Sequence, residues 1–563
     1  MSTSLRPWLT SYPPEVPDQL TYPEIPLYEL LIQSAAAHPH KPALFFMGKE
    51  ITYEQLLEQC YRFANALDQL DVKKGDRVAI MLPNIPQSVI AYYGALLAGA
   101  TVVQTNPLYT ERELLHQMTD SGATVIVCLD LLYPRVKKIK KDTLLTHVIV
   151  TGIKDYLPLA KKLFYPFVQW KQRQRVQVKE GESSGVYLLP SLLARSSPAP
   201  IRTAVDIWED VALIQYTGGT TGRAKGAMLT HRNLIANVVQ CGAWFYKAVP
   251  GQERILAAVP FFHVYGMTVA MNFGIYIGAK LLLVPRFDVD MMLKLIDHQQ
   301  PTVFPGAPTM YIGLMNHPEL GSYNISSIEA CLSGSAPLPI EVQQKFEALT
   351  GGRLVEGYGL TECSPVTHAN PIWGRRINGS IGLPWPDTEC KIVDVETGEE
   401  QPVGSIGELC VRGPQVMKGY WNQVEETQAS LKDGWFFTGD MCSMDEEGYF
   451  YIVDRKKDMI IAGGFNIYPR EIEEVLYEHP AVKEAAVIGI PDAYRGETVK
   501  AFISVRANEG VTEEELNAYC RQRLAAFKVP RVYEFRDELP KTAVGKILRR
   551  ALLDEERKKT EQK

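Results

Sequence analysis

The stretch from Tyr216 to His231, YTGGTTGRAKGAMLTH, has the clearest chemical potential in this chain. It combines four glycines, four threonines and one lysine, Lys225. Glycines let backbone N–H groups come close to an anion, threonine hydroxyls can donate hydrogen bonds, and the lysine adds a positive charge. This combination predicts a loop that binds phosphate groups.

The P-loop of nucleoside triphosphatases is the main alternative for this stretch. It requires the pattern GxxxxGK[ST] and a helix that starts at the lysine, so that the helix N-terminus faces the phosphates. Here Ala224 precedes Lys225, and the residues GAMLT that follow predict a strand, with a helix only from about His231. The predicted context is therefore strand–loop–strand, which argues against a P-loop. A glycine-rich hairpin without a ligand is the plainer alternative.

The elements around this loop follow from the alternation of sequence patterns in the first part of the chain. The predicted order is strand 76–83, helix 86–99, strand 100–107, helix 110–122 and strand 123–129. Thr110 and Glu113 form a capping-box pattern at the start of the second helix. Strands that alternate with helices are typical of crossover units and a largely parallel sheet.

The pattern changes near Asp454, where YIVDRKKDMIIAGGFNIYPREIEEVL places charged residues and two glycines between a strand and a helix. A charged joint of this kind is typical of a hinge, and the residues after it suffice for a small domain. The sequence therefore predicts an α/β fold. A large N-terminal domain (1–454) has mixed, largely parallel sheets and helices, a hinge spans 455–457, and a small mobile α+β C-terminal domain spans 458–563.

Composition argues against several classes of protein. The chain has 563 residues, a net charge of −6 and a pI near 6.0, so it lacks the strongly basic character of a general nucleic-acid binder. Its nine cysteines form no CxxC pair, which indicates reduced thiols in a cytoplasmic protein. The ten histidines show no metal-ligand spacing, and the N-terminus has no apolar segment typical of a secretory signal.

The residues between Arg254 and Lys280 imitate a membrane span, because they are apolar over a sufficient length. Pro260, His263 and Asn272 interrupt the run. The prediction is a buried strand, a loop and a buried helix rather than a transmembrane helix.

Three further stretches carry a family resemblance when they are taken together with YTGGTTGRAKG. They are YGLTE (358–362), DGWFFTGD (433–440) followed by YIVDRKKDMI, and PKTAVGKILRR (540–550). In this order and spacing they resemble the adenylate-forming enzymes, which include acyl-CoA ligases, luciferases and peptide-synthetase adenylation domains. The likeness covers nearly the whole chain, and it is greatest to bacterial long-chain fatty-acid–CoA ligases.

The resemblance implies a two-step reaction with ATP, a fatty acid and coenzyme A as substrates and Mg²⁺ as cofactor. The carboxylate attacks the α-phosphate of ATP and releases pyrophosphate, and the thiol of coenzyme A then attacks the acyl carbon and releases AMP. Two alternatives stay open among enzymes: a ligase for aromatic or medium-chain acids, and an enzyme that passes its acyl group to a carrier protein. A non-catalytic nucleotide- or lipid-binding module would be expected to lack Lys546 or Glu362, and both are present.

The resemblance also assigns site residues. Glu362 is expected to hold Mg²⁺ against the phosphates, and Asp440 to accept both ribose hydroxyls with help from Arg455. Lys546 is expected to place an ammonium group between the carboxylate and the triphosphate, whose mutual repulsion opposes the reaction. Ala224 stands where many relatives have proline, which loosens the loop slightly. The other residues expected to contact ATP are Thr217, Gly218, Gly219, Thr220, Thr221, Gly222, Lys225, Gly334, Ser335, Ala336, Glu356, Gly357, Tyr358, Gly359 and Thr361.

Between the two steps, members of this family swing the small domain about a hinge. Lys457 matches the hinge position, and Gly463 and Gly464 are expected to line the route of the thiol. His263, in PFFHVYG, matches a gate beside the acyl carboxylate, although a lone histidine in an apolar run is as often simply packed.

A fatty chain needs a long apolar tunnel, which we expect residues 263–275 and 301–315 to supply, with Met267 and Gly306 in its lining. Residues 131–180 interleave basic residues with large apolar ones, a pattern that suits peripheral contact with the anionic inner face of a membrane. A solvated connecting helix is the plainer interpretation of that segment. The resemblance also allows a homodimer.

Overall fold

The structure is a computed structural model, and it describes residues 6–163, 176, 178–217, 224–462, 465–492, 495–506, 509–541 and 547–561. The chain forms two compact units. The larger consists of Leu9–Glu389 and Arg412–Gly434, and the smaller of Met1–Trp8, Cys390–Val411 and Trp435–Lys563. The smaller unit thus takes in residues before Asp454 as well as the C-terminal segment. The hinge at 455–457 lies inside it and stays a prediction.

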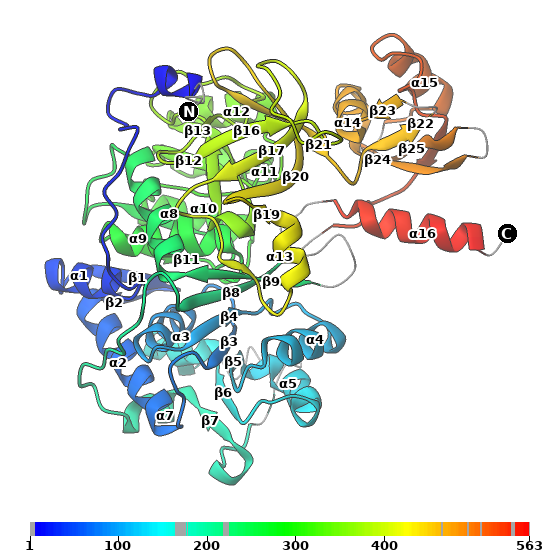
Figure 1. The fold of residues 1–563 in the computed structure, drawn as a ribbon. Helices are drawn as coiled ribbons and strands as arrows, with labels where there is room; N and C mark the ends of the chain where they lie inside the picture. The colour runs from blue at the N-terminus through cyan, green and yellow to red at the C-terminus, as the bar shows by residue number, and fades with distance from the viewer. Residues whose placement is uncertain are drawn as a thin grey trace. The chain divides into compact units, whose positions relative to one another are not determined.

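An eight-stranded sheet forms one part of the larger unit (Figure 1). Its order is β18 (Gly419–Tyr420), β9 (Lys225–Thr230), β8 (Val211–Thr217), β4 (Thr101–Gln104), β3 (Arg77–Met81), β5 (Val125–Leu129), β6 (His147–Thr151) and β7 (Val186–Leu188). The pairs from β8 to β7 are parallel, whereas β9 and β18 join antiparallel at one end. The predicted largely parallel sheet is confirmed.

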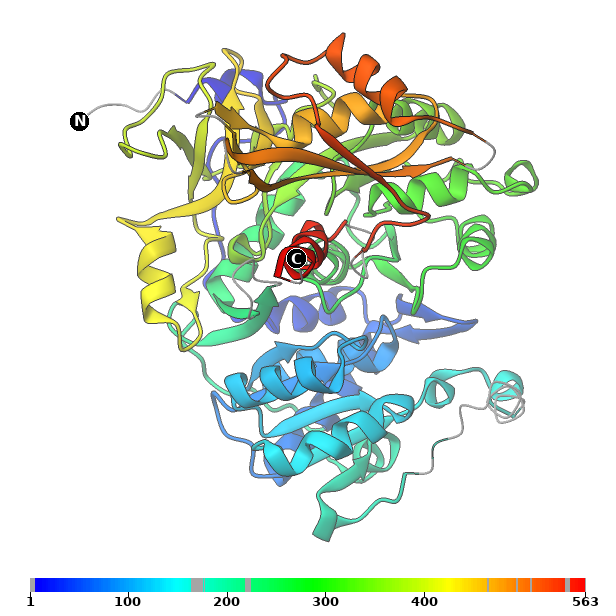
Figure 2. The ribbon, with the colours of Figure 1, turned by 90° about the vertical axis from the view of Figure 1, so that its right-hand side faces the viewer.

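Helices cover both faces of this sheet. Helices α4 (Glu111–Ser121) and α5 (Tyr133–Ile139) cover one face, the one turned toward the viewer in Figure 2, and bury Leu114 and Val136 against β3, β5 and β6. On the other side, α3 (Pro86–Leu97) packs against β3, α2 (Tyr53–Gln69) against α3, and α7 (Leu189–Arg195) against α2. The predicted capping box of Thr110 and Glu113 opens α4. The predicted alternation of strands and helices is therefore confirmed.

Two four-stranded sheets complete the larger unit. The first has the order β10 (Arg254–Ala257), β11 (Lys280–Leu283), β1 (Pro42–Phe46) and β2 (Lys49–Thr52). The second has the order β12 (Ala330–Ser333), β13 (Arg353–Gly359), β14 (Val366–Ala369) and β15 (Leu383–Pro384). Further helices of this unit are α1 (Glu29–Ala37), α8 (His231–Trp244), α10 (Val289–Gln299), α11 (Pro308–Met315), α12 (Ile340–Thr350) and α13 (Val424–Ser430).

The apolar run between Arg254 and Lys280 is not a single helix. It forms β10, a loop, the π-helical segment η6 (Gly266–Asn272) and the short helix α9 (Phe273–Tyr276), and nearly all of it is buried. The predicted strand, loop and buried helix are confirmed. Within the described ranges, no helix combines the length and apolar character needed to cross a bilayer.

The smaller unit contains two sheets. In the first, β17 (Gly407–Arg412) and β21 (Phe450–Arg455) pair antiparallel with the two sides of β20 (Trp435–Met444), and β16 (Glu389–Val393) extends the sheet beyond β17. The second has the order β23 (Phe465–Ile467), β22 (Ile460–Ala462), β25 (Gly496–Val505) and β24 (Val482–Asp492), with β26 (Val532–Phe535) parallel to β25.

Alternate residues of β24 point to opposite faces of this second sheet. Val487 packs with α14 (Pro469–Tyr477) and α15 (Glu513–Arg521), whereas Ile488 packs with Leu552 of α16 (Arg549–Glu561). The sheet therefore has helices on both faces, and the predicted α/β class is confirmed. All nine cysteines of the chain are buried, and no disulfide joins them.

The first residue of α8 gives a pH-dependent contribution to stability. His231 is buried, and its Nδ1 accepts a hydrogen bond from the Leu27 N–H at 3.0 Å. Burial lowers the pKa of His231 to about 4 from an ordinary 6.5. The unfolded chain therefore binds this proton more strongly than the folded one, and stability falls as the pH drops below about 6.5. At pH 5, this histidine lowers the free energy of unfolding by about 2 kcal/mol.

We expect His231→Asn to reduce this loss, because the amide oxygen can accept the same hydrogen bond and does not titrate. Melting temperatures of the wild type and the variant between pH 7.5 and pH 5 would test this. Parallel curves for the two proteins would contradict the assignment.

Candidate active site

The predicted phosphate loop connects two antiparallel strands. Thr217, at the end of β8, pairs directly with Lys225, at the start of β9, and α8 begins only at His231. The predicted strand–loop–strand context is confirmed. The loop residues Gly218, Gly219, Thr220, Thr221 and Gly222 lie outside the described residues, as do Gly463, Gly464 and Lys546.

The residues predicted to surround adenine lie at the carboxyl ends of two adjacent parallel strands. Ser333 of β12 pairs with Glu356 of β13, so the turn that carries Gly334, Ser335 and Ala336 lies beside the end of β13. The Glu356 carboxylate accepts a hydrogen bond from the Leu338 N–H at 3.1 Å, which ties this turn to β13. Carboxyl ends of parallel strands are the usual place for ligands in α/β folds.

Beyond Glu356, the end of β13 is shaped by close packing. A Cβ atom on Gly359 would lie 2.2 Å from the Pro365 carbonyl oxygen, so any other residue would force the chain apart. Tyr358 pairs across the sheet with His368 of β14, and their rings meet edge to face with centroids 5.8 Å apart. Burial lowers the pKa of His368 to about 3, so a neutral ring supports Tyr358.

Glu362 lies in the short 3₁₀ helix η8 (Thr361–Cys363), directly after Thr361. Its Oε1 accepts a hydrogen bond from the Tyr420 hydroxyl at 2.7 Å, and its backbone carbonyl accepts one from the Met417 N–H at 2.7 Å. Tyr420 of β18 and Met417, two residues before that strand, therefore fix the carboxylate and the main chain of the expected magnesium ligand.

His263 lies in the loop between β10 and η6, and two buried amide side chains hold this loop. The Gln215 side chain donates to the Phe262 carbonyl at 2.9 Å, and Asn84 Oδ1 accepts from the Phe261 N–H at 2.8 Å. Because Gln215 lies two residues before Thr217, His263 stands near the end of β8. Burial lowers the pKa of His263 to about 4, so at neutral pH the imidazole is uncharged. It can pack or form hydrogen bonds there, but it adds no positive charge.

The two predicted acyl-pocket residues lie in different elements. Met267 is fully buried within η6. Gly306 bridges to Ser333, and its carbonyl accepts from the Gly334 N–H at 3.0 Å, so it adjoins the turn after β12. Their place in an acyl tunnel stays a prediction.

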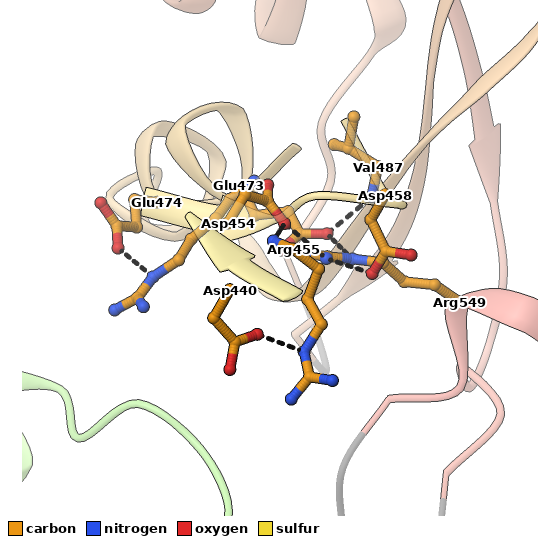
Figure 3. Close-up of polar contacts among 9 residues, drawn as sticks. Asp440, Asp454, Arg455, Asp458, Glu473, Glu474, Val487 and Arg549 are labelled. Atoms are coloured by element: carbon orange, nitrogen blue, oxygen red, sulfur yellow. Dashed lines mark hydrogen bonds and ion pairs between the residues drawn. The ribbon is translucent and has the colours of Figure 1, made fainter. Parts of the chain in front are cut away.

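Asp440 and Arg455 are brought together in the smaller unit. They pair across β20 and β21, and Arg455 Nε lies 2.7 Å from Asp440 Oδ1, as Figure 3 shows. The Asp440 side chain is only 2% exposed, and this ion pair fixes one of its carboxylate oxygens. An oriented carboxylate of this kind suits bidentate hydrogen bonding to a diol such as ribose.

The two residues after Arg455 differ in their surroundings. Lys456 Nζ pairs with Glu408 at 2.9 Å, and the other Glu408 oxygen accepts from the Gly439 N–H at 3.1 Å. Burial lowers the pKa of Lys457, the residue at the predicted hinge position. Lys457 therefore follows two residues of the predicted hinge that are each held by a carboxylate.

Arg549 connects the C-terminal segment to this region (Figure 3). It forms a bidentate ion pair with Glu473 of α14, with Nε at 2.9 Å, and it lies 3.2 Å from Asp454 and 3.3 Å from Asp458. Burial raises the pKa of Glu473, while the attraction of Arg549 opposes the change. Asp454 also accepts from the Arg470 N–H at 2.7 Å, so it links β21 with α14.

The chain on either side of residues 542–546 is joined close to Arg549. Lys541 and Ile547 form an antiparallel bridge, and the Leu548 N–H donates to the Pro540 carbonyl at 2.8 Å. Lys541 also forms an ion pair with Glu484 of β24. Both ends of the segment that contains Lys546 are thus attached to the second sheet and its helices.

Sequence reasoning did not single out Tyr420, Glu426, Glu408 or Arg549. Glu426 of α13 forms an ion pair with Lys225. The KGYWN pattern around Tyr420, in which an aromatic pair follows a glycine, could have indicated a functional residue at this position. Arg549 belongs to the KILRR run, which was interpreted only through Lys546.

These features are those of an α/β enzyme of the adenylate-forming class: the residues predicted to bind phosphate and adenine lie at or near strand ends, and the residue predicted to bind ribose, Asp440, lies within β20. Residues 31–421 match the family model described as AMP-binding enzyme, and residues 471–546 match its C-terminal domain. The chain belongs to the AMP-binding enzyme family, as the resemblance predicted.

Curated relatives of this chain match it over almost their whole length. It is 54% identical over 554 residues to the long-chain-fatty-acid–CoA ligase of Bacillus subtilis, which covers 98% of both chains. It is 43% identical to the ligase of the same name from Escherichia coli O157:H7, over 99% of both chains.

The fold of this chain is similar to that of several solved structures. ATP-bound MatB from Rhodopseudomonas palustris has a TM-score of 0.82 at 31% identity, covering 94% of this chain and 98% of that one. The anthranilate CoA ligase AuaEII in complex with anthranoyl-AMP has a TM-score of 0.83 at 28% identity, covering 96% and 99%.

Removing Arg549 is expected to destabilise the smaller unit strongly. Arg549→Met leaves three carboxylates without their shared cation, and breaking a buried pair costs about 3–5 kcal/mol. The adjacent Arg550→Met is the matched control, since Arg550 pairs with Asp554 one helical turn away at a half-exposed position, where such pairs give about 0.5 kcal/mol. Urea unfolding followed by circular dichroism would compare them, and equal losses would contradict this account.

Proposed function

We propose that this protein is a long-chain fatty-acid–CoA ligase that uses ATP to convert a fatty acid into its coenzyme A thioester. The observation that carries the proposal is the 54% identity to the Bacillus subtilis ligase over 98% of both chains. The positions of Lys225 at the start of β9, Tyr358 near the end of β13 and Glu362 in η8 just after it support the proposal, because the first step requires a phosphate-binding hairpin and an adenine platform.

In the first step a carboxylate oxygen of the fatty acid forms a bond to the α-phosphorus of ATP, and the bond to the bridging oxygen breaks. Pyrophosphate leaves and an acyl-adenylate remains. Two anions must approach each other, so cations have to offset their repulsion. In this proposal Lys225 faces the terminal phosphates, Asp440 binds the ribose and Lys546 stabilises the transition state.

The residues present fit a magnesium ion that is held jointly with ATP. Mg²⁺ typically keeps several waters and takes one or two protein carboxylates together with substrate phosphates. Glu362 supplies one carboxylate, oriented by Tyr420. In the described part of the chain, no group of three or more His, Cys, Asp or Glu side chains is placed to hold a metal ion. Bound there, Mg²⁺ would neutralise phosphate charge.

In the second step the sulfur of coenzyme A forms a bond to the acyl carbon and the bond to the AMP oxygen breaks, with the thiol proton passing to solvent. We assign Lys457 to the hinge that exchanges the two arrangements, and Gly463 and Gly464 to the thiol route. His263, neutral by burial, is assigned to the wall of the acyl site rather than to charge stabilisation.

A ligase for aromatic acids is the second candidate. The observation that favours it is the fold similarity to the anthranilate CoA ligase structure, with a TM-score of 0.83. Its identity of 28% is about half of that to the Bacillus subtilis long-chain ligase, which is why the long-chain proposal comes first.

A panel of carboxylic acids separates the two candidates. Palmitate and oleate should give coenzyme A thioester and pyrophosphate at rates at least about tenfold above octanoate and anthranilate, because each additional buried methylene contributes about 0.8 kcal/mol. Thioester formation from anthranilate or octanoate with none from palmitate would reject the long-chain proposal.

Within this assay, Lys546→Ala separates the two steps. Exchange of labelled pyrophosphate into ATP in the presence of palmitate should fall about 10²- to 10³-fold, since an oriented charge is lost from the first transition state. Thioester formation from synthetic palmitoyl-adenylate should fall much less. Lys558→Ala, an exposed lysine of α16, is the matched control.

Peripheral membrane contact through residues 131–180 is part of the proposal. Leu159 and Leu163 are 82% and 80% exposed and flank Lys161 and Lys162, which suits docking on an anionic bilayer. Residues 164–175 and 177 of this segment lie outside the described residues.

Vesicle flotation tests this contact. We expect the wild type to float with phosphatidylglycerol vesicles, and the double variant Leu159→Ser, Leu163→Ser to lose several-fold in bound fraction, because buried apolar area drives insertion. Val424→Ser, which removes an exposed apolar side chain elsewhere, is the control. Equal flotation of all three proteins would contradict the proposed membrane contact.

A further inference from the structure

The segment Met417–Ser430 lies along the edge of the eight-stranded sheet, next to the strand that begins with Lys225. Within it, Gly419 and Tyr420 pair with Met228 and Ala227 of β9. The Trp421 N–H donates to the Gly226 carbonyl at 2.8 Å. This pairing sets the position of Tyr420 and of the helix α13 that follows.

Helix α13 returns toward β9 and carries Glu426. The Tyr420 N–H donates to Thr427 Oγ1 at 2.9 Å, which holds the first turns of the helix beside β18. As a result the Glu426 carboxylate reaches the ammonium of Lys225, 201 positions earlier in the chain, and the two form an ion pair with a separation of 2.5 Å.

One side chain, that of Tyr420, connects the Lys225–Glu426 ion pair with Glu362, the expected magnesium ligand. Lys225 Nζ lies 5.4 Å from the centroid of the Tyr420 ring, and the hydroxyl of the same ring donates to Glu362 at 2.7 Å. The side chain of Lys225 is 18% exposed and that of Glu426 39% exposed. The carboxylate of Glu426 is thus within reach of solvent while it binds a more buried cation.

A carboxylate oxygen and a phosphate oxygen bind an ammonium group in the same way, through a short charge-assisted hydrogen bond. Lys225 is the residue assigned to the terminal phosphates. The carboxylate of Glu426 therefore accepts a hydrogen bond from the same ammonium group that those phosphates need. Since Lys225 is the cation that both anions require, the two compete for it, and their negative charges repel each other.

We propose that Glu426 is an internal competitor of the ATP terminal phosphates for Lys225, and that it lowers the affinity of the site for ATP and for pyrophosphate. The inference rests on the proposed function. Binding of the triphosphate moves Lys225 from Glu426 to a phosphate oxygen. After the first step, Glu426 takes Lys225 back and so favours release of pyrophosphate.

A purely supporting role for Glu426 predicts the opposite effect. If the ion pair only held Lys225 in the orientation that binds phosphate, its loss would weaken ATP binding. A general field effect of one negative charge is the other alternative, and Glu425 allows it to be measured. Glu425 is exposed on the same turn of α13, so Glu425→Gln makes the same charge change one residue away.

The test is isothermal titration calorimetry with α,β-methylene-ATP, inorganic pyrophosphate and AMP, each with Mg²⁺, on the full chain. Glu426→Gln should bind the triphosphate analogue and pyrophosphate about threefold to tenfold more tightly than the wild type. AMP, which lacks the terminal phosphates, should bind with unchanged affinity, and this also reports that the variant is folded. Glu425→Gln should change each affinity less than about twofold.

A double-mutant cycle with Lys225→Met links the effect to the ion pair. In that background Glu426→Gln should no longer tighten binding of the analogue, because the contested cation is gone. Unchanged or weaker binding by Glu426→Gln, or an equal gain by Glu425→Gln, would overturn the inference. A wild type that binds neither AMP nor the triphosphate analogue would instead reject the proposed function.

Discussion

Charge balance is the constraint on which the candidate active site depends. A site that joins two anions must gather cations, and a charged group that is buried in the fold needs a counter-ion of its own. Within each unit, the chain gives the cations near the predicted substrate-binding residues carboxylate partners of its own. These pairs are Lys225–Glu426, Arg455–Asp440 and Lys456–Glu408. Each carboxylate thereby belongs to the folded scaffold, and two of them, Glu426 and Asp440, are also proposed to take part in substrate binding.

Strand pairing within the sheets determines where these charged side chains lie. Antiparallel pairing of β8 with β9 places Thr217 opposite Lys225, and parallel pairing of β12 with β13 places the turn after Ser333 beside Glu356. In the smaller unit, pairing of β20 with β21 places Asp440 opposite Arg455. The register between paired strands thus determines which of these side chains meet.

Features with a local cause could be predicted from the sequence. The alternation around α3 and α4, the capping box at Thr110 and the strand after Lys225 depend on neighbouring residues, and the structure has all of them. Tyr420 and Glu426 were missed because β18 has only two residues, too few for a periodic pattern, and their partners lie 58 and 201 positions away. Arg549 was missed because its carboxylates come from two distant stretches, one with Asp454 and Asp458 and one with Glu473.

The burial of all nine cysteines has a consequence for an enzyme that makes an acyl-adenylate. Such a mixed anhydride acylates any thiolate that can reach it. Burial raises the pKa of most of these thiols, so they stay protonated and poorly nucleophilic at neutral pH. Acylation of the protein's own cysteines is therefore disfavoured, and the incoming thiol of coenzyme A meets no exposed cysteine thiol of the chain as a competitor.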